Sequence, residues 1–156
     1  MSQVALDQPV PDFTAEATGG HTIRLADLRG HKVVIYFYPR DNTPGCTTEG
    51  QAFRDHHADF QAANTVILGV SRDSLKSHEN FKAKHGFPFE LISDPEEKLC
   101  RLFDVIKEKN MYGRKVMGIE RSTFLIDAEG VLRRQWRKVK VKGHVEEVLE
   151  ACRALP

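Results

Sequence analysis

The hydrophobic positions of this chain are gathered into short runs that polar segments separate. The clearest run, residues 33–38, consists entirely of β-branched and aromatic side chains, and Pro39 closes it. This composition is typical of a central strand that is buried on both faces. A second apolar run at residues 66–70 predicts another buried strand.

Four segments of the sequence carry the signals of helices. The first begins with Thr43 as N-cap and Pro44 at the first helical position, and the third begins with a capping pattern, Ser-Asp-Pro-Glu-Glu, at Ser93. A second, polar helix is expected to end at Gly86. The last helix has apolar residues at i, i+3, i+4 and i+7, which places them on one face. We therefore expect helices over about residues 44–62, 74–85, 95–105 and 145–152.

Two hairpins complete the predicted elements. Residues 13–17 and 21–25 flank a Thr-Gly-Gly turn, and residues 123–127 and 131–136 flank an Ala-Glu-Gly turn. No repeat or linker divides the chain, so residues 1–156 are expected to form a single domain. The succession of elements predicts an α/β fold with a mixed central sheet flanked by helices and an N-terminal β-hairpin.

The composition restricts the possible classes of function. The chain has 156 residues, of which 40% are hydrophobic and 29% charged, and a formal net charge of +1. A protein of this kind is globular and lacks the basic field that would hold nucleic acid or an anionic membrane. The longest apolar run is far shorter than the roughly 20 residues that span a bilayer. Residues 1–13 lack the basic and apolar regions of an export signal, so we expect a cytoplasmic protein.

The three cysteines, Cys46, Cys100 and Cys152, match no C-x-x-C or zinc-ligand spacing. Neither a disulfide framework nor a metal site is indicated, and no cofactor is expected. Cys100 and Cys152 fall on apolar faces of predicted helices, as is typical of cysteines that only pack in a core.

Cys46 has a different environment, because it follows the strongest strand and is the third residue of the first predicted helix. The unpaired N–H groups of a first helical turn favour an anion. A thiol with the ordinary pKa near 8.5 is only about 3% ionised at pH 7, but a helix N-terminus and a nearby cation favour the reactive thiolate. By position alone, Cys46 could equally be a reactive cysteine or merely a small residue at the start of a helix.

Two segments of the sequence together decide between these interpretations. One is the thirteen-residue run Phe-Tyr-Pro-Arg-Asp-Asn-Thr-Pro-Gly-Cys-Thr-Thr-Glu, which places Pro39, Thr43 and Cys46 in the spacing P-x-x-x-T-x-x-C. The other is Arg-Ser-Thr-Phe-Leu-Ile-Asp, which begins at Arg121. Both resemble the peroxiredoxins and, more narrowly, the bacterioferritin comigratory protein or peroxiredoxin Q subfamily. The resemblance spans nearly the whole chain.

The resemblance implies a monomer with a thioredoxin-like fold that reduces hydrogen peroxide and organic hydroperoxides. Cys46 is implied as the peroxidatic cysteine, which becomes a sulfenic acid. Thr43 is expected to hydrogen-bond the peroxide as well as to cap the helix, and Pro39 to shield the pocket. Arg121 is expected to favour the thiolate and the polarised transition state. Glu49 either fixes an arginine through a salt bridge or is only a solvated carboxylate.

The sequence departs from the subfamily at the resolving cysteine. Many members carry this second cysteine five residues after the first, where this chain has Gln51; others carry it in the next helix, and residues 74–85 contain none. We therefore expect a one-cysteine mechanism, in which an external thiol reduces the sulfenic acid. Glutathione with glutaredoxin, or thioredoxin, is the expected reductant. A two-cysteine mechanism with Cys100 as resolving thiol is the alternative, and Cys152 is a weaker candidate for the same role.

Two residue patterns suggest other classes of function. Metal handling is suggested by His56 and His57, but adjacent helical residues point about 100° apart and cannot share a ligand face. Polyanion binding is suggested by a strip of basic residues at 133–142, which is more typical of a charged edge strand with Val139 and Val141 pointing inward.

Two further segments have roles that the sequence leaves open. Gly50, in the helix after Cys46, either softens the first turns so that a reductant can enter or allows a close packing contact. Residues 107–117 are basic and have no periodic pattern, which predicts a long loop and a candidate border of the substrate pocket.

Overall fold

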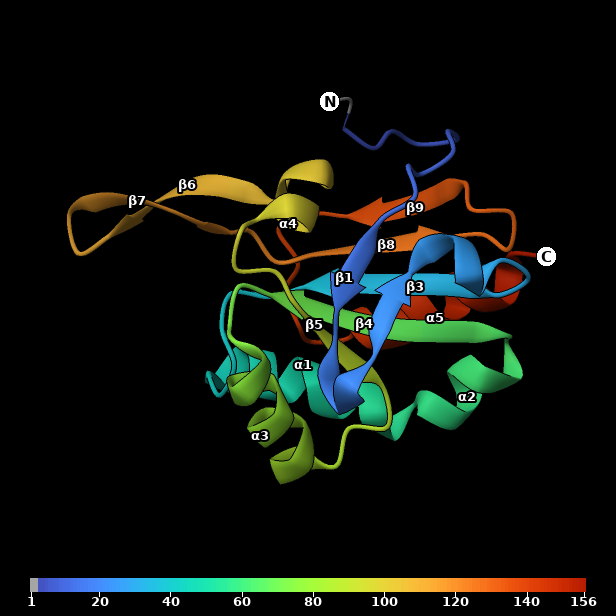
Figure 1. The fold of residues 1–156 in the computed structure, drawn as a ribbon, viewed down its shortest axis with the longest axis horizontal. Coiled ribbons are helices and arrows are strands. Elements are labelled where there is room, and N and C mark those ends of the chain that lie inside the picture. Colours follow the sequence, from blue (N-terminus) through green and yellow to red (C-terminus); the bar gives the residue numbers. More distant parts are fainter. Residues whose placement is uncertain (1–2) are drawn as a thin grey trace.

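The computed structural model describes residues 3–156 and has a five-stranded sheet at its centre (Figure 1). Its strands are β3 (Lys32–Phe37), β4 (Thr65–Ser71), β5 (Glu90–Ser93), β8 (Ser122–Ile126) and β9 (Leu132–Trp136). They are arranged in the order β5-β4-β3-β8-β9, with β3, β4 and β5 parallel and β8 and β9 antiparallel to their neighbours. The predicted mixed sheet and its two apolar strands are confirmed, whereas the four-residue strand β5 was not predicted.

The two faces of the sheet are covered by different elements, because the side chains of β3 alternate between them. Val34 and Tyr36 belong to one apolar cluster, and Ile35 and Phe37 belong to the other. The first face is covered by α1 (Pro44–Asp55), α2 (His57–Ala62), α3 (Leu75–His85) and α5 (His144–Ala154). The second face is covered by α4 (Lys98–Leu102) and by the N-terminal strands β1 (Thr14–Glu16) and β2 (Thr22–Arg24).

The helix predicted over residues 44–62 is interrupted at His56, where φ is −100° and ψ is 7°. The chain therefore forms α1 and α2 in place of one helix. The interruption leaves both Phe53 and Phe60 fully buried in the same apolar cluster. Packing against the sheet thus decides the path of the chain here, over the local preference for one continuous helix.

Helix α3 has the predicted bounds and caps, and α5 has the predicted apolar stripe. At the start of α3, the Ser77 N–H donates to the Ser74 hydroxyl oxygen over 3.1 Å, and at its end Gly86 is left-handed with φ 64°. The apolar stripe of α5 is buried as expected and consists of Val145, Val148, Leu149 and Cys152. None of the helices between residues 3 and 156 has the length and apolar character needed to cross a membrane.

The prediction for α4 was wrong at both ends. The helix begins at Lys98, because Glu97 is left-handed (φ 62°) and the Asp94 carboxylate accepts from the N–H groups of Leu99 and Cys100. Asp94 therefore caps a helix that starts several residues later than its Pro-Glu-Glu sequence indicates. The helix ends at Leu102, well before the residue at which the prediction placed its end.

Both predicted hairpins are present. Strands β1 and β2 pair antiparallel around a short 3₁₀ helix, Thr18–Gly20, in which Gly19 and Gly20 both have φ 72°. Strands β8 and β9 pair antiparallel with a register shift at residues 125–126.

The prediction of a long loop at residues 107–117 was wrong. This segment forms a third hairpin, in which β6 (Ile106–Met111) pairs antiparallel with β7 (Arg114–Ile119). The connection is Tyr112-Gly113, and both residues have positive φ, as a two-residue type I′ turn requires. The polar strands give no alternating hydrophobic signal because most of their side chains are exposed.

The prediction for the basic strip at residues 133–142 was wrong in part. Strand β9 does lie at the edge of the sheet, but it ends at Trp136. Val139 and Val141 therefore lie beyond the strand, where both are half-buried. The N–H of Val139 donates to the carbonyl oxygen of Arg121 over 3.0 Å, so this segment packs beside the chain that carries Arg121.

Candidate active site

Cys46 lies in the first turn of α1, as the sequence predicted. The helix begins at Pro44, after the loop that follows the carboxyl end of β3, and the Thr47 N–H donates to the Thr43 carbonyl oxygen over 2.9 Å. The Cys46 side chain is turned inward, so the residue is only 2% exposed. The thiol thus lies at the positive end of a twelve-residue helix and largely out of contact with water.

Arg121, between β7 and β8, directly contacts the thiol. Its Nη2 donates to Cys46 Sγ over 3.4 Å, and its Nη1 donates to Glu49 Oε1 over 2.6 Å. Burial lowers the pKa of Arg121, but the negative charges of Glu49 and Cys46 outweigh this effect and leave its pKa raised. Arg121 therefore supplies a permanent positive charge at the sulfur atom.

Gly45 makes room for this contact, which sequence reasoning missed. A Cβ atom at this position would lie 3.1 Å from Nη2 of Arg121, closer than ordinary contact permits. Because Nη1 is held by Glu49, the guanidinium is not free to retreat without weakening one of its two bonds. A side chain at Gly45 would thus move Arg121 relative to Cys46.

Glu49 is the buried partner of Arg121 and is fully shielded from solvent. Of the two expectations for this residue, the salt bridge is the one that the structure shows. Its second oxygen, Oε2, has no hydrogen-bond partner among the described residues. Burial raises the pKa of Glu49 to about 7, although Arg121 opposes that rise. The carboxyl group therefore titrates near neutral pH.

Replacing Glu49 with glutamine is expected to remove a pH-dependent part of the stability. Because burial raises the pKa from its ordinary value of 4.5 to about 7, the folded protein retains a proton that the unfolded chain releases. The stabilisation that this proton provides is fully present below the pKa of the unfolded chain, and it is lost as pH rises through the pKa of the folded protein. In urea titrations between about pH 5 and pH 8, the wild type should lose stability relative to Glu49→Gln as pH rises. A difference that stays constant over this range would contradict the assignment.

Thr43 and Pro39 are near the helix start, but their contacts only partly match the expectations. Thr43 occupies the N-cap position, yet its side chain makes no cap hydrogen bond, so that prediction was wrong. The Thr43 hydroxyl donates to the Arg40 carbonyl oxygen over 2.9 Å, which leaves its oxygen free to accept from a peroxide O–H. Pro39 is half-buried two residues after β3. The roles of both residues toward a peroxide stay predictions.

The loop between β3 and α1 is anchored by Asp41, a buried residue whose role the sequence did not reveal. Its carboxylate accepts from the Tyr38 hydroxyl over 2.6 Å and from the Ser77 hydroxyl over 2.8 Å. The third partner is His78, whose Nδ1 lies 2.7 Å from Asp41 Oδ2 and whose Nε2 lies 2.9 Å from the Ile92 carbonyl oxygen. Both ring nitrogens of His78 thus lie beside oxygen atoms, so its ring joins the loop before α1 to α3 and β5.

Asp41, Asp73 and His78 lie close enough together to suggest a metal site, since one possible ligand atom from each is within 4.8 Å of the others. Their oxygen atoms, however, already accept hydrogen bonds. Oδ2 of Asp73 accepts from the Ser71 hydroxyl over 2.5 Å and from the Asp41 N–H over 2.9 Å. This cluster therefore acts as a hydrogen-bonded anchor that ties the loop before Cys46 to α3.

The two remaining cysteines are remote from Cys46. Cys100 belongs to the apolar cluster on the opposite face of the sheet, and burial raises the pKa of its thiol. Cys152 is on the same face as Cys46, but its carbonyl accepts from Lys32 Nζ at the start of β3, while Cys46 follows the end of that strand. Six strand residues span roughly 17 Å. A disulfide needs Cα atoms within about 7 Å, so neither thiol can pair with Cys46 in this conformation.

The remaining candidates from the sequence have structural explanations. A Cβ atom at Gly50 would lie 2.5 Å from the ring of Phe87, so this glycine permits a close packing contact. His56 lies beside Asp59 and Glu146, while His57 faces the ring of Phe89. The two histidines thus point to different neighbours.

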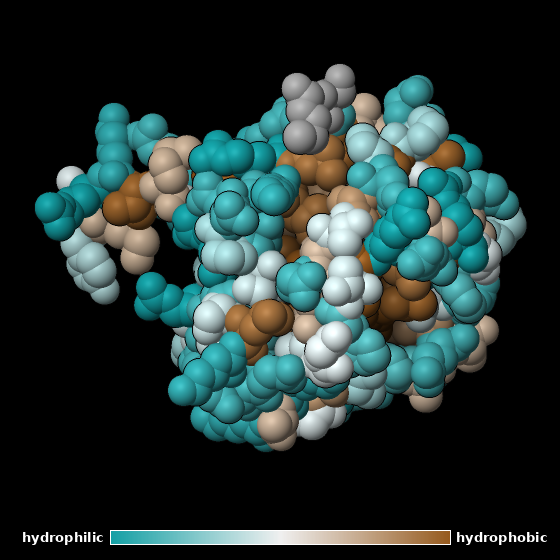
Figure 2. Space-filling model, viewed as in Figure 1, coloured by the Kyte–Doolittle hydropathy of each residue, from teal (hydrophilic) through white to brown (hydrophobic). Residues whose placement is uncertain are grey.

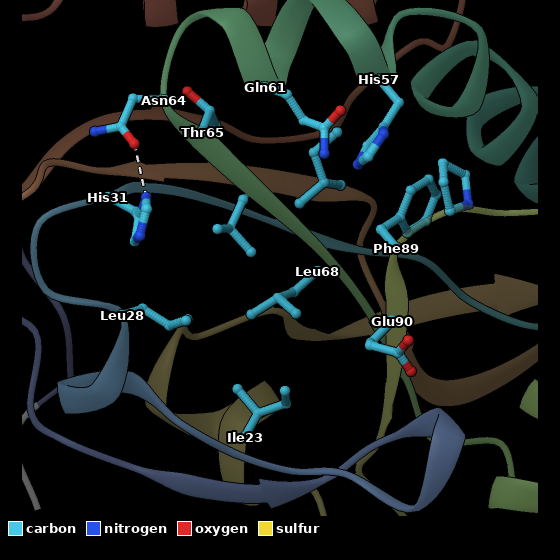
Figure 3. Close-up of a pocket in the computed structure, with 13 residues that line it drawn as sticks. Ile23, Leu28, His31, His57, Gln61, Asn64, Thr65, Leu68, Phe89 and Glu90 are labelled. Carbon is cyan, nitrogen blue, oxygen red and sulfur yellow. Dashed lines mark hydrogen bonds between the residues drawn. The ribbon is translucent and has the colours of Figure 1, made fainter.

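His57 lines a separate pocket of about 430 Å³ (Figure 3). The pocket lies beside the first residues of β4, and its lining includes His31, Asn64, Leu68 and Glu90. The pocket is not lined by Cys46, Thr43, Arg121 or Pro39.

Comparisons with known proteins show the family of the chain. Residues 6–135 match the AhpC/TSA family. The chain is 55% identical to peroxiredoxin Bcp of Xanthomonas campestris, over 99% of this chain and 98% of that protein, and 51% identical to peroxiredoxin Bcp of Bacillus subtilis, over 96% of each.

A solved structure of the Xanthomonas campestris bacterioferritin comigratory protein, studied for alkyl peroxide reduction, superimposes with a TM-score of 0.90. It is 55% identical in sequence and covers 97% of this chain and 98% of that one. This likeness confirms the expected thioredoxin-like fold. The chain therefore belongs to the AhpC/TSA family and, within it, to the bacterioferritin comigratory protein subfamily of peroxiredoxins.

Proposed function

We propose that this thiol-dependent peroxidase uses Cys46 to attack the peroxide and an external thiol to regain its reduced form. The observation that carries the proposal is the contact between Arg121 Nη2 and Cys46 Sγ at the start of α1. A cation and a helix N-terminus at one sulfur atom both favour the thiolate over the thiol.

The same groups serve the chemical step. The Cys46 thiolate attacks one peroxide oxygen, the S–O bond forms as the O–O bond breaks, and the second oxygen leaves with the electron pair and takes up a proton. Arg121 is positioned to stabilise the negative charge as it moves from sulfur to the leaving oxygen. The Thr43 hydroxyl oxygen is available to accept from the peroxide and so to orient it. Pro39 helps to close the site.

Hydrogen peroxide and organic hydroperoxides are the proposed substrates. Support comes from the related Xanthomonas campestris protein, which was studied for alkyl peroxide reduction. Turnover assays with hydrogen peroxide and with an alkyl hydroperoxide, each supplied with an excess of dithiothreitol, test this assignment. A protein that consumes neither peroxide would contradict it.

The one-cysteine mechanism is supported by the positions of the other thiols. Cys100 is on the opposite face of the sheet and Cys152 is at the opposite end of β3, so the Cys46 sulfenic acid has no partner within the chain at hand. Glutathione with glutaredoxin, or thioredoxin, would supply the missing thiol. We also propose that the protein is a cytoplasmic monomer. Its free buried cysteines support a reducing compartment.

A further inference from the structure

The hairpin formed by β6 and β7 projects from the body of the protein (Figure 1). It carries large apolar side chains that are strongly exposed: Tyr112 is 99%, Met117 56% and Met111 51% accessible. Figure 2 shows apolar and hydrophilic residues side by side on this arm. Exposed apolar side chains gathered on one projecting element mark a site of interaction.

The two faces of the hairpin differ in charge. Side chains alternate along each strand and paired residues share a face, so Lys109, paired with Val116, lies on the same face as Met111, paired with Arg114. We call these four residues the cation face. Within residues 3–156, neither Lys109 nor Arg114 forms an ion pair.

The opposite face carries Met117 and Lys115, and Lys115 Nζ lies 3.5 Å from Glu108 Oε1. The positive charge on that face is therefore balanced by a carboxylate. The cation face, in contrast, carries the exposed Arg114 and the half-buried Lys109 beside two apolar side chains, and no carboxylate of the described residues pairs with either cation. This combination suits an acidic partner.

The cation face leads to the active site. The Lys109 ammonium donates to the carbonyl oxygen of Ile119, two residues before Arg121. Burial lowers the pKa of Lys109, and the charge of Arg121 lowers it further, while the Cys46 thiolate acts in the opposite direction. The base of the cation face thus lies beside the segment that carries Arg121, whose Nη2 contacts Cys46 Sγ.

We propose that the cation face docks an acidic dithiol protein that reduces the Cys46 sulfenic acid. This inference rests on the one-cysteine mechanism proposed above. A partner thiolate attacks the Cys46 sulfur, an S–S bond replaces the S–O bond, and the hydroxide that leaves takes up a proton to become water. The second thiolate of the partner then attacks the partner's first sulfur atom, which is bonded to Cys46 in the mixed disulfide. This step releases the Cys46 thiolate and leaves the partner with an internal disulfide.

Opposite charges on the two proteins accelerate their encounter. Transient complexes of this kind also have small interfaces, so a surface of a few residues is enough. Cys46 is only 2% exposed, so few orientations of a colliding protein bring its thiol to the sulfur atom. A docking site on the hairpin would increase the fraction of encounters that have the correct orientation.

The test compares two double variants. Arg114→Glu/Val116→Ser alters the cation face, and Lys115→Glu/Met117→Ser makes the same kinds of change on the opposite face. The protein is first oxidised with one equivalent of peroxide and then mixed with reduced thioredoxin of net negative charge or with uncharged dithiothreitol. The cation-face variant should react with thioredoxin about tenfold more slowly at low ionic strength, and the difference should shrink at about 0.5 M salt. Its reaction with dithiothreitol, and both reactions of the control variant, should stay within about twofold of wild type.

An equal loss in both variants, or a loss that extends to dithiothreitol, would overturn the docking proposal. So would a wild-type dimer that the cation-face variant loses in sedimentation, because the face would then bind a second copy of the chain. Efficient reduction by glutathione together with no effect of the cation-face change on thioredoxin would also overturn it. A wild-type protein that forms no sulfenic acid at all would refute the proposed function instead.

Discussion

Replacing Cys46 with serine is expected to abolish peroxide reduction, leaving no turnover above the uncatalysed background. A serine hydroxyl is not ionised at neutral pH and cannot form a sulfenic acid, so neither Arg121 nor the helix N-terminus can restore the reaction. The measurement is stopped-flow peroxide consumption by wild type and Cys46→Ser at equal concentrations.

The matched controls for this variant are Cys100→Ala and Cys152→Ala. Both residues are buried in apolar clusters, so each change should cost stability without altering the rate at which folded protein reacts with peroxide. If Cys46→Ser retained turnover, or if Cys100→Ala lost it while still folded, the assignment of the nucleophile would be wrong.

Replacing Arg121 with methionine is expected to slow the reaction with peroxide by about 10²- to 10³-fold, the usual effect of removing a group that stabilises a transition-state charge. The variant loses the hydrogen-bond donor to Cys46 Sγ and the positive charge that pairs with the Glu49 carboxylate. Rapid-mixing kinetics under pseudo-first-order conditions give the second-order rate constant directly.

Two companion variants separate catalysis from stability in this prediction. Arg121→Met leaves Glu49 buried without its partner, which destabilises the fold, whereas Arg121→Met/Glu49→Gln removes the unpaired carboxyl group and should recover stability but not activity. Arg121→Lys keeps the charge but cannot bind both partners with one planar group, so its rate should fall between wild type and Arg121→Met. Recovery of full activity in the double variant would show that Arg121 acts only on stability.

The central part of the site was predictable because its residues are local in sequence or belong to a specific motif. The apolar run that forms β3 and the Thr-Pro pair that starts α1 place Cys46 at a helix N-terminus. The motif that contains Arg121 then supplied a cation from a distant segment, and the structure brings the two within 3.4 Å.

The remaining features depend on long-range contacts that local patterns do not encode. The anchor between Asp41 and His78 joins residues far apart in sequence, and nothing around His78 distinguishes it from a surface histidine. The interruption at His56 is a consequence of tertiary packing. The hairpin over residues 106–119 was mistaken for a loop because its exposed strands lack hydrophobic alternation.

The most direct test of the one-cysteine mechanism is to locate the oxidised residue. Wild-type protein is treated with one equivalent of peroxide, trapped with a reagent that reacts with sulfenic acids, and analysed by intact-mass and peptide mass spectrometry. In a sample taken before trapping we expect one added oxygen atom, and in the trapped sample we expect the reagent to be attached to Cys46; in both, most molecules should contain no disulfide. Oxidation confined to Cys100 or Cys152, or a Cys46–Cys100 or Cys46–Cys152 disulfide in most molecules, would contradict it.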